Sequence, residues 1–344
     1  MKHLLNTLYV TSQGSYLAKE GETVAVRLEN ETRLRLPMHT LEGIVCFGQV
    51  GASPALMGFC GESNVALSFM SENGRFLARV QGAVSGNVLL RREQYRRADD
   101  PAATSAIVQP IVSAKIANSR SVLTRVLRDH PEISGTEEVQ QSADHLAKVL
   151  KSLRGGEHPL DTLRGWEGEA AMQYFSVFDH LIVSQKETFQ FFNRNRRPPL
   201  DKVNALLSFI YTLLRHDVGA ALEGVGLDPG VGFLHRDRPG RPGLALDLME
   251  EFRPYIADRL VLSLINRQQV KPNGFTQSET GGIRMDDDTR KTVIQAYQER
   301  KREEILHPFL NEKMALGLLP HIQARLLARH LRGDLDAYPP FIWR

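Results

Sequence analysis

The chain has 344 residues, of which 42% are apolar and 24% are charged, and its formal net charge is +3. This length and composition are typical of a globular protein that buries its own core without disulfide staples. No apolar run approaches the roughly 18 residues of a membrane-spanning helix, and we expect no signal peptide because the first residues lack a long apolar segment. The two cysteines, Cys46 and Cys60, have no metal-binding spacing, so we expect buried thiols in a reducing compartment and a cytoplasmic protein.

The first 80 residues have the pattern of β structure. Apolar and polar residues alternate from Thr23 to Leu28 and from Arg33 to Leu36, and turn residues such as Glu20-Gly21 separate the runs. Further short apolar strands are expected at residues 5–11, 44–47 and 65–70, and one short helix at residues 54–60. Several short strands this closely spaced predict a small sandwich.

Helical periodicity replaces this alternation beyond Ser85-Gly86-Asn87. An apolar stripe passes through Ile107, Ile111 and Ala114, and Asp201 is placed to cap another helix. We therefore expect an α+β protein with a small N-terminal β-sandwich domain followed by a larger all-helical catalytic domain. The expected divisions are residues 1–85 for the β domain, 86–95 for a linker that starts the first helix, and 96–344 for the helical domain.

Basic side chains are concentrated near this division. Residues 84–129 contain eight basic and four acidic side chains, a net charge of +4 that exceeds that of the whole chain. Such a concentration is suited to binding phosphates, although a solvated helix face is the ordinary alternative. Residues 190–197 interleave aromatic side chains with arginines, which suits contact with a DNA backbone or the end of a helix. The candidate DNA-binding residues are Arg91, Arg92, Arg96, Arg97, Arg194, Arg196 and Arg197.

Candidate catalytic groups lie in separate segments. On a helix, Glu167 and Glu169 diverge by about 200°, so one of them at most points into a given cleft. His235 follows an apolar pair in a glycine-flanked loop, and loops often position functional groups. Each of these residues, taken alone, is better explained as a structural or exposed side chain.

A third segment carries several carboxylates. Asp247, Glu250 and Glu251 recur at helical spacing, so we expect them on one face, where a bound cation or a nearby arginine such as Arg253 would relieve their repulsion. Together the segments supply carboxylate, imidazole and carboxylate, a set that suits Mg²⁺ or Mn²⁺. Such an ion can polarise a phosphodiester. The spacing does not show that the three segments meet in space.

As a set, these segments resemble the CRISPR adaptation integrase, or Cas-one, family. The motifs that carry the resemblance are Ser85-Gly86-Asn87-Val88-Leu89-Leu90-Arg91-Arg92-Glu93-Gln94-Tyr95-Arg96, Glu167-Gly168-x-Ala170-Ala171-x-x-Tyr174-Phe175, Arg196-Arg197-Pro198-Pro199-x-Asp201-x-Val203-Asn204-Ala205-Leu206-Leu207-Ser208, and Gly230-x-Gly232-Phe233-Leu234-His235 with Asp247-Leu248-Met249-Glu250-Glu251-Phe252-Arg253-Pro254. The C-terminal Tyr338-Pro339-Pro340-Phe341-Ile342-Trp343 looks most like the subtype I-C branch.

The resemblance implies a metal-dependent DNA endonuclease and integrase. Such an enzyme joins the 3′-hydroxyl ends of a short duplex to the repeat of a CRISPR array by transesterification. It implies a homodimer, and two such dimers flanking a dimer of the small Cas-two protein in a heterohexamer on double-stranded DNA. The subtype resemblance adds the Cas-four nuclease as a further partner. The family's metal ligands, for Mg²⁺ or Mn²⁺, carry over to Glu167, His235 and Glu250.

Asp247 matches a second acidic catalytic position of the family, close to the ion. It would act as an orienting carboxylate or accept a proton from the attacking hydroxyl. Two rival interpretations are a DNA-binding protein without catalysis and a metal-dependent nuclease without integrase activity. Metal-dependent strand transfer with the Cas-two partner separates the first interpretation from both rivals.

Overall fold

The computed structural model describes residues 6–29, 31–72, 76–80, 82, 88–279 and 281–343. The chain divides into two compact units between residues 86 and 87. Residues 83–87, where the division between the domains was expected, and Leu5, the expected start of the first strand, lie outside the described residues. No helix in the described ranges is long and apolar enough to cross a membrane.

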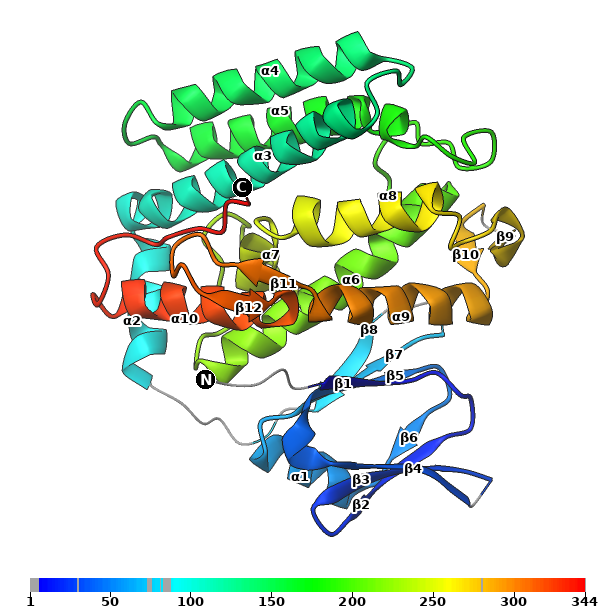
Figure 1. Ribbon diagram of the computed structural model, residues 1–344. Coiled ribbons are helices and arrows are strands. Elements are labelled where there is room, and N and C mark those ends of the chain that lie inside the picture. The colour runs from blue at the N-terminus through cyan, green and yellow to red at the C-terminus, as the bar shows by residue number, and fades with distance from the viewer. Residues whose placement is uncertain are drawn as a thin grey trace. The chain divides into compact units, whose positions relative to one another are not determined.

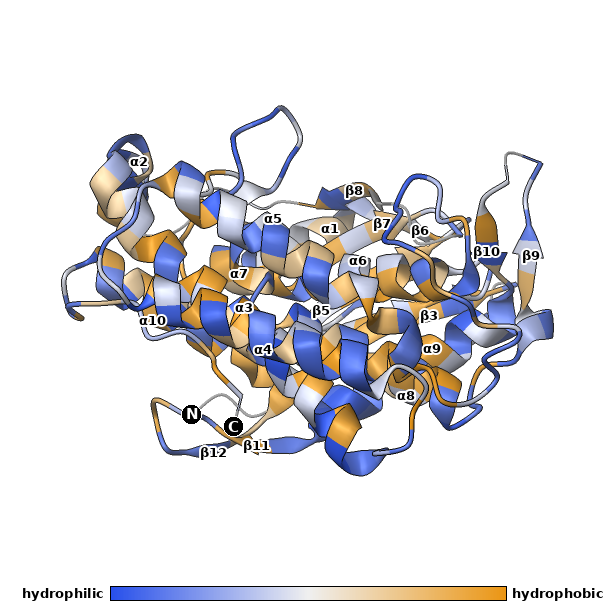
Figure 2. Cartoon of the chain, turned by 90° about the horizontal axis from the view of Figure 1, so that it is seen from above, coloured by the Kyte–Doolittle hydropathy of each residue, from blue (hydrophilic) through white to orange (hydrophobic). Residues whose placement is uncertain are grey.

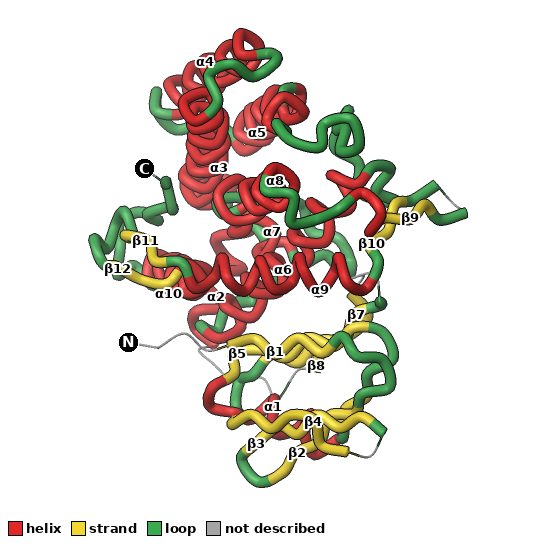
Figure 3. Tube along the Cα trace, turned by 45° about the vertical axis from the view of Figure 1, so that its right-hand side comes forward, coloured by secondary structure: helices red, strands yellow, loops and turns green. Residues whose placement is uncertain are grey.

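The N-terminal unit consists of two four-stranded sheets. Its elements are β1 (Asn6–Val10), β2 (Tyr16–Glu20), β3 (Thr23–Leu28), β4 (Glu31–Pro37), β5 (Leu41–Phe47), β6 (Gly51–Ala52), α1 (Pro54–Glu62), β7 (Ala66–Met70) and β8 (Phe76–Val80). One sheet has the order β1-β5-β7-β8, and the other has the order β4-β3-β2-β6. Figure 3 shows them as two layers of strands.

The two sheets share one apolar core, which confirms the predicted sandwich. Leu17 and Val24 from one sheet and Ile44 and Leu67 from the other belong to a single buried cluster. Helix α1 contributes Leu56 and Cys60 to the same cluster. The predicted strands and the short helix are confirmed in place, whereas β2, β6 and β8 were not predicted.

The C-terminal unit is largely helical. Its helices are α2 (Val88–Asp99), α3 (Pro101–Asp129), α4 (Thr136–Leu153), α5 (Leu160–Ser176), α6 (Lys202–Gly224), α7 (Gly243–Met249), the π-helical segment η3 (Arg253–Asp258), α8 (Arg259–Asn266), α9 (Asp287–Arg302) and α10 (Leu319–Leu331). Two short hairpins, β9 (Phe275–Gln277) with β10 (Ile283–Met285) and β11 (Glu304–Leu306) with β12 (Lys313–Ala315), show that the unit is not entirely helical.

Helix α3 is the longest element and carries the predicted apolar stripe. It begins where Asp100 accepts hydrogen bonds from the backbone N–H groups of Ala102 and Ala103, at 2.9 and 3.3 Å. Helices α3, α4 and α5 all pack against one another and form a group at one side of the unit (Figure 1). The outer side of α4 is hydrophilic in Figure 2, because its apolar residues face the other two helices.

Helix α6 begins as the sequence predicts. The side chain of Asp201 accepts a hydrogen bond from the backbone N–H of Asn204 at 2.7 Å, which satisfies one of the unpaired donors of the first turn. Helix α6 packs against α7, η3 and α10. The segment from α7 to η3 therefore lies inside the unit and contacts both α3 and α6.

The two thiols of the sandwich core yield a first prediction. Cys46 and Cys60 are free and buried, and burial raises the pKa of Cys46 to about 12 and that of Cys60 to about 11. The thiolate is the reactive form, so a rise of two to three pKa units lowers its population by about a hundred- to a thousandfold. We expect a disulfide reagent at pH 8 to label the native protein at least about a hundredfold more slowly than the chain in guanidinium. Fast labelling of both thiols in the native protein would contradict this burial.

Candidate active site

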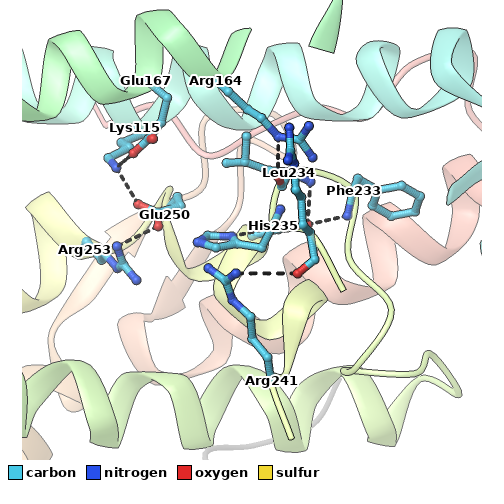
Figure 4. A network of polar contacts seen from close by, with 11 residues as sticks. Lys115, Arg164, Glu167, Phe233, Leu234, His235, Arg241, Glu250 and Arg253 are labelled. Carbon is cyan, nitrogen blue, oxygen red and sulfur yellow. Dashed lines mark hydrogen bonds and ion pairs between the residues drawn. The ribbon is translucent and has the colours of Figure 1, made fainter. Parts of the chain in front are cut away.

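Four elements of the C-terminal unit meet around Lys115. Glu167 projects from α5, Lys115 from α3, and Glu250 from the first residue after α7. Figure 4 shows the Lys115 ammonium between the two carboxylates, with His235 from the loop before α7 nearby. The structure therefore brings Glu167 and Glu250, which are 83 positions apart, to one cation.

Lys115 is nearly buried and pairs with both carboxylates. Its Nζ lies 2.8 Å from Oε2 of Glu250 and forms an ion pair with Oε1 of Glu167. Burial alone would lower the pKa of Lys115, but the charges of Glu250 and Glu167 outweigh it and hold the pKa above its ordinary value. The sequence placed Lys115 among the basic residues of segment 84–129 that could bind phosphates. That prediction is wrong for Lys115, because its side chain is buried and its charge is paired inside the unit.

Glu250 is ionised although its side chain is only 2% exposed. Burial would raise the pKa of this carboxyl, but Arg253, Lys115 and His235 lower it to about 2. Nη1 of Arg253 lies 2.6 Å from Oε1 of Glu250. The predicted partnership of Glu250 with Arg253 is therefore confirmed, and Lys115 is an additional partner that the sequence did not indicate.

Asp247 is fully buried and holds the histidine loop. Its carboxylate accepts hydrogen bonds from the backbone N–H groups of Phe233, Leu234 and His235, at 2.5, 2.9 and 2.9 Å. Its Oδ1 also lies 2.6 Å from Nδ1 of His235. Because an ionised carboxylate only accepts, Nδ1 carries a proton, and in the neutral ring Nε2 is the nitrogen with the lone pair. This arrangement orients a histidine for metal binding through Nε2.

Close packing between the histidine loop and α7 requires glycine. A Cβ atom on Gly232 would lie 2.8 Å from Oδ2 of Asp247 and 2.7 Å from the carbonyl carbon of Gly243. A Cβ on Gly243 would meet the backbone of Gly230 and Gly232 at 2.8 to 3.2 Å. These glycines let the loop approach the helix closely enough for its N–H groups to reach Asp247.

The three carboxylates of the third segment do not share one face, contrary to expectation. Helix α7 ends at Met249, so the helical spacing assumed for Asp247, Glu250 and Glu251 does not continue. Asp247 holds the histidine loop, Glu250 faces Lys115 and Arg253, and Glu251 points to the C-terminal end of the chain. Burial raises the pKa of Glu251 to about 8, although hydrogen bonds from the chain end oppose the rise.

Glu167 and Glu169 diverge as predicted. Glu169 lies 2.8 Å from Nε2 of His145 on α4, whereas Glu167 faces Lys115 on α3. The two glutamates of one helix therefore contact different neighbouring helices, and of the two only Glu167 contacts Lys115.

The candidate DNA-binding arginines fall into two groups. Arg92, Arg96, Arg196 and Arg197 are exposed, whereas Arg91, Arg97 and Arg194 are half-buried. Arg97 instead donates to Glu93 at 2.9 Å. Arg194 donates to Oδ1 of Asn204 at 2.6 Å and lies over the ring of Tyr211, and burial lowers its pKa. We expect phosphate contacts from the exposed group, because the internal contacts of Arg194 and Arg97 restrain their side chains.

A buried tyrosine–aspartate network lies behind the site and was not predicted. Arg253 stacks on the ring of Tyr211 at 4.9 Å, and Tyr211 donates to Oδ1 of Asp258 at 2.6 Å. Tyr174, on the same helix as Glu167, donates to Oδ2 of Asp258 at 3.1 Å. The network links the partner of Glu250 to the helix that carries Glu167. In the sequence, Tyr174 stood out only as a position of the family motif, and nothing there indicated its contact with Asp258.

Glu167, Glu250 and His235 carry the kinds of donor atom that bind a divalent metal ion. Within the described ranges, no three His, Cys, Asp or Glu side chains are placed so that they could hold a metal ion. Lys115 stands between Glu167 and Glu250 instead, so two carboxylates already face a position that a positive charge stabilises. With the Nε2 of His235 directed by Asp247, the donor set is one that Mg²⁺ or Mn²⁺ accepts.

The C-terminal unit thus combines two carboxylates paired with one lysine and a histidine oriented by a buried aspartate. The sequence model of the family described as "CRISPR associated protein Cas1" matches residues 8–299, and the chain belongs to this family. A "CRISPR-associated endonuclease Cas1 1" of Chlorobaculum tepidum is 56% identical over 344 residues, which is 100% of both chains. The protein is therefore an endonuclease of CRISPR adaptation.

Solved structures agree with this assignment. A CAS1 protein from Thermotoga maritima is 25% identical, with a TM-score of 0.80 over 95% of this chain and 97% of that one. A casposase bound to its integration product has a TM-score of 0.82, covering 98% of this chain and 94% of that one. That casposase is 23% identical, so it shows the shared fold alone.

Some relatives occur with other CRISPR proteins. A Cas4 exonuclease and Cas1 endonuclease fusion of Geobacter sulfurreducens is 34% identical over 98% of this chain and 60% of that protein. A chain of a Cas6-RT-Cas1–Cas2 complex matches with a TM-score of 0.82 and 22% identity, covering 100% of this chain and 36% of that one.

The buried Asp258 gives a prediction on pH. Burial raises its pKa from near 4 to about 6, although Tyr211, Tyr174, Arg253 and Arg194 oppose the rise. Between pH 4 and 6 the folded protein keeps a proton that the unfolded chain has released, so this contribution is present below about pH 4 and is lost as the pH rises to about 6. The difference of about 2 pKa units corresponds to about 3 kcal/mol.

We expect the stability of the wild type relative to Asp258→Asn to fall by up to about 3 kcal/mol between pH 4 and pH 7. Urea unfolding of both proteins across this range measures it. Two stability curves that stay parallel would show that Asp258 does not titrate in this window.

Proposed function

We propose that this Cas1 endonuclease is an integrase that joins the 3′-hydroxyl ends of short duplex DNA to the repeat of a CRISPR array by transesterification. The observation that carries the proposal is the convergence of Glu167 and Glu250 on one cation, beside a histidine whose ring is held by Asp247. The shared fold with a casposase bound to an integration product is consistent with strand transfer on this scaffold.

Glu167, Glu250 and Nε2 of His235 are the groups that would hold Mg²⁺ or Mn²⁺. When bound, the ion supplies Lewis-acid stabilisation of the charge that develops on the phosphate. Within the chain, Lys115 and Arg253 balance the two carboxylate charges, and together they keep Glu250 ionised. The tyrosine–aspartate network behind Arg253 holds its guanidinium against Glu250.

We assign Asp247 an orienting role. Its two oxygens already accept four hydrogen bonds from the histidine loop, so neither is placed to accept a proton from the attacking hydroxyl. It fixes the tautomer of His235 and therefore which ring nitrogen faces the ion. Of the two roles that the sequence left open for Asp247, we therefore propose the orienting role and not that of proton acceptor.

We further propose that the protein acts in the cytoplasm as a homodimer, and assembles with Cas2 in a heterohexamer on double-stranded DNA. The Cas1–Cas2 complex formed by a protein of the same fold supports this partnership. The fusion of a relative to Cas4 supports cooperation with a Cas4 nuclease, as expected for a subtype I-C system.

Replacing His235 by alanine separates binding from chemistry. The change removes one proposed ligand but none of the exposed arginines, so the variant should fold and bind duplex at low ionic strength. Strand transfer with Mn²⁺ and Cas2 should fall by at least about a hundredfold, which corresponds to about 2.7 kcal/mol of lost transition-state stabilisation. Gel analysis of a labelled duplex joined to a repeat-containing target measures the rate.

Glu167→Ala should behave as His235→Ala does, and the double variant should lose little more than either, because the groups act as a unit. Glu169→Ala is the matched control, since this side chain lies on the same helix but faces His145. Normal integration by His235→Ala, or loss of integration in Glu169→Ala alone, would refute the assignment of the site.

The exposed arginines provide a separate test of DNA contact. Changing Arg92 and Arg96 to alanine should weaken duplex binding equally for all sequences and reduce the slope of log affinity against log salt by about 2. Titration by fluorescence anisotropy at several salt concentrations measures this slope. The control is Arg302→Ala with Arg325→Ala, which makes the same charge change at two other exposed positions. Equal slopes for both double variants would mean that Arg92 and Arg96 are only solvated.

A further inference from the structure

The chain end closes over the residue next to Glu250. We call residues 338–343 the C-terminal strap. Glu251 is fully buried, and its Oε1 accepts a hydrogen bond from the hydroxyl of Tyr338 at 2.7 Å. Its Oε2 accepts from the backbone N–H of Phe341 at 2.8 Å and from Nε2 of Gln323, on α10, at 3.1 Å. Two of the three donors to this carboxyl group therefore come from the strap.

Helix α3 holds both the strap and the turn formed by Glu250 and Glu251, which we call the acidic turn. Nδ2 of Asn118 donates to the backbone carbonyl oxygens of Glu251 and Phe341, at 2.8 and 2.9 Å. Its Oδ1 accepts from the backbone N–H of Trp343 at 2.8 Å. Lys115 lies three positions earlier, so the two side chains share one side of α3. One of them holds Glu250 and the other holds the backbone of Glu251, and the chain end lies alongside this helix (Figure 1).

Aromatic packing fixes the strap to the segment after Glu251. Tyr338 and Phe341 are 2% and 1% exposed. The ring of Phe341 lies 5.6 Å from that of Tyr255 in η3, and Trp343 lies 4.7 Å from the same ring. The strap thus covers the turn that leads from Glu250 into η3. Pro339 and Pro340 restrict the backbone between Tyr338 and Phe341, so the two donors to Glu251 keep a fixed spacing.

We propose that the C-terminal strap is a positioning element of the active site. By satisfying Glu251, it fixes the backbone of the acidic turn and so directs the carboxylate of Glu250 towards Glu167 and Lys115. A buried carboxyl group that loses its hydrogen bonds is destabilising. The strap, while it is bound to Glu251, therefore holds the acidic turn in this conformation. The inference rests on the proposed role of Glu250 as a metal ligand. It gives the C-terminal motif, which the sequence marked only by resemblance, a physical role.

Tyr338→Phe in the full-length protein tests the strap with the smallest change. It removes one hydrogen bond to Glu251 and keeps the ring. We expect the affinity for Mn²⁺, measured by electron paramagnetic resonance of the free ion, to fall about tenfold, as for other residues that orient a ligand. The kcat for strand transfer with Cas2 should fall while the KM for duplex DNA stays unchanged, because the exposed arginines are untouched.

Tyr297→Phe is the matched control. Tyr297 is equally buried, and its hydroxyl donates to Asp217 at 2.9 Å, away from the acidic turn. This variant should lower the Tm to a similar extent and leave the Mn²⁺ affinity and kcat at the wild-type level. A second variant of the same contact, Glu251→Gln, keeps the volume of the side chain but replaces one of the two accepting oxygens with an NH2 group, which accepts nothing. It should weaken Mn²⁺ binding at least as much, and adding Tyr338→Phe to it should cost little more, since both act through one contact.

Glu250→Ala distinguishes a failure of the strap's positioning role from a failure of the proposed metal site itself. If it loses Mn²⁺ affinity and activity while Tyr338→Phe and Glu251→Gln change only the Tm, the strap is merely structural and the inference is overturned. If Glu250→Ala binds Mn²⁺ and transfers strands like the wild type, the proposed function fails and the inference fails with it. Loss of Mn²⁺ affinity in all three variants, with Tyr297→Phe unaffected, is the expected result.

Discussion

The buried carboxylate of Glu250 and the partly exposed carboxylate of Glu167 cannot lie close together without a positive charge between them, and Lys115 provides that charge. Glu167 and Glu250 come from different parts of the chain and would repel each other in a medium of low dielectric constant. Lys115 and Arg253 together supply two positive charges for two negative ones, so the cluster is balanced within the protein itself. The position of α3 against α5 and the acidic turn therefore matters more to this site than any single loop.

Further contacts keep the partners of this cluster in place. Asp247 fixes the histidine loop through four hydrogen bonds, and Asp258 connects the ring beneath Arg253 to the helix of Glu167. Each buried acid is thus satisfied by donors from a different element. Unsatisfied buried polar groups are expensive, so this pattern restricts the relative movement of those elements.

Local patterns predicted the parts of the fold that local interactions determine. The strand Thr23–Leu28, the cap at Asp201 and the divergence of Glu167 from Glu169 all follow from periodicity or capping chemistry, and the structure contains them. Strand β2 was missed because its residues end in Lys19-Glu20, and its place in the sheet is determined by pairing with β3. The burial of Lys115 was missed for a similar reason, because its partners lie 52 and 135 positions away in the sequence. The shared face of Asp247 and Glu250 was wrong because it assumed that α7 continues beyond Met249.

The π-helical segment η3 affects which changes in length the chain tolerates. A π-turn contains one residue more than the α-helical turn it replaces. Deleting one residue between Arg253 and Asp258 would therefore convert this turn to α-helical winding and leave the flanking residues in register. Arg253 would stay beside Glu250, and Asp258 would stay beside Tyr174 and Tyr211. The same deletion from the α-helical turns of α8 would rotate the side chains that follow it by about 100°, so related chains should lose a residue more readily in η3 than in α8.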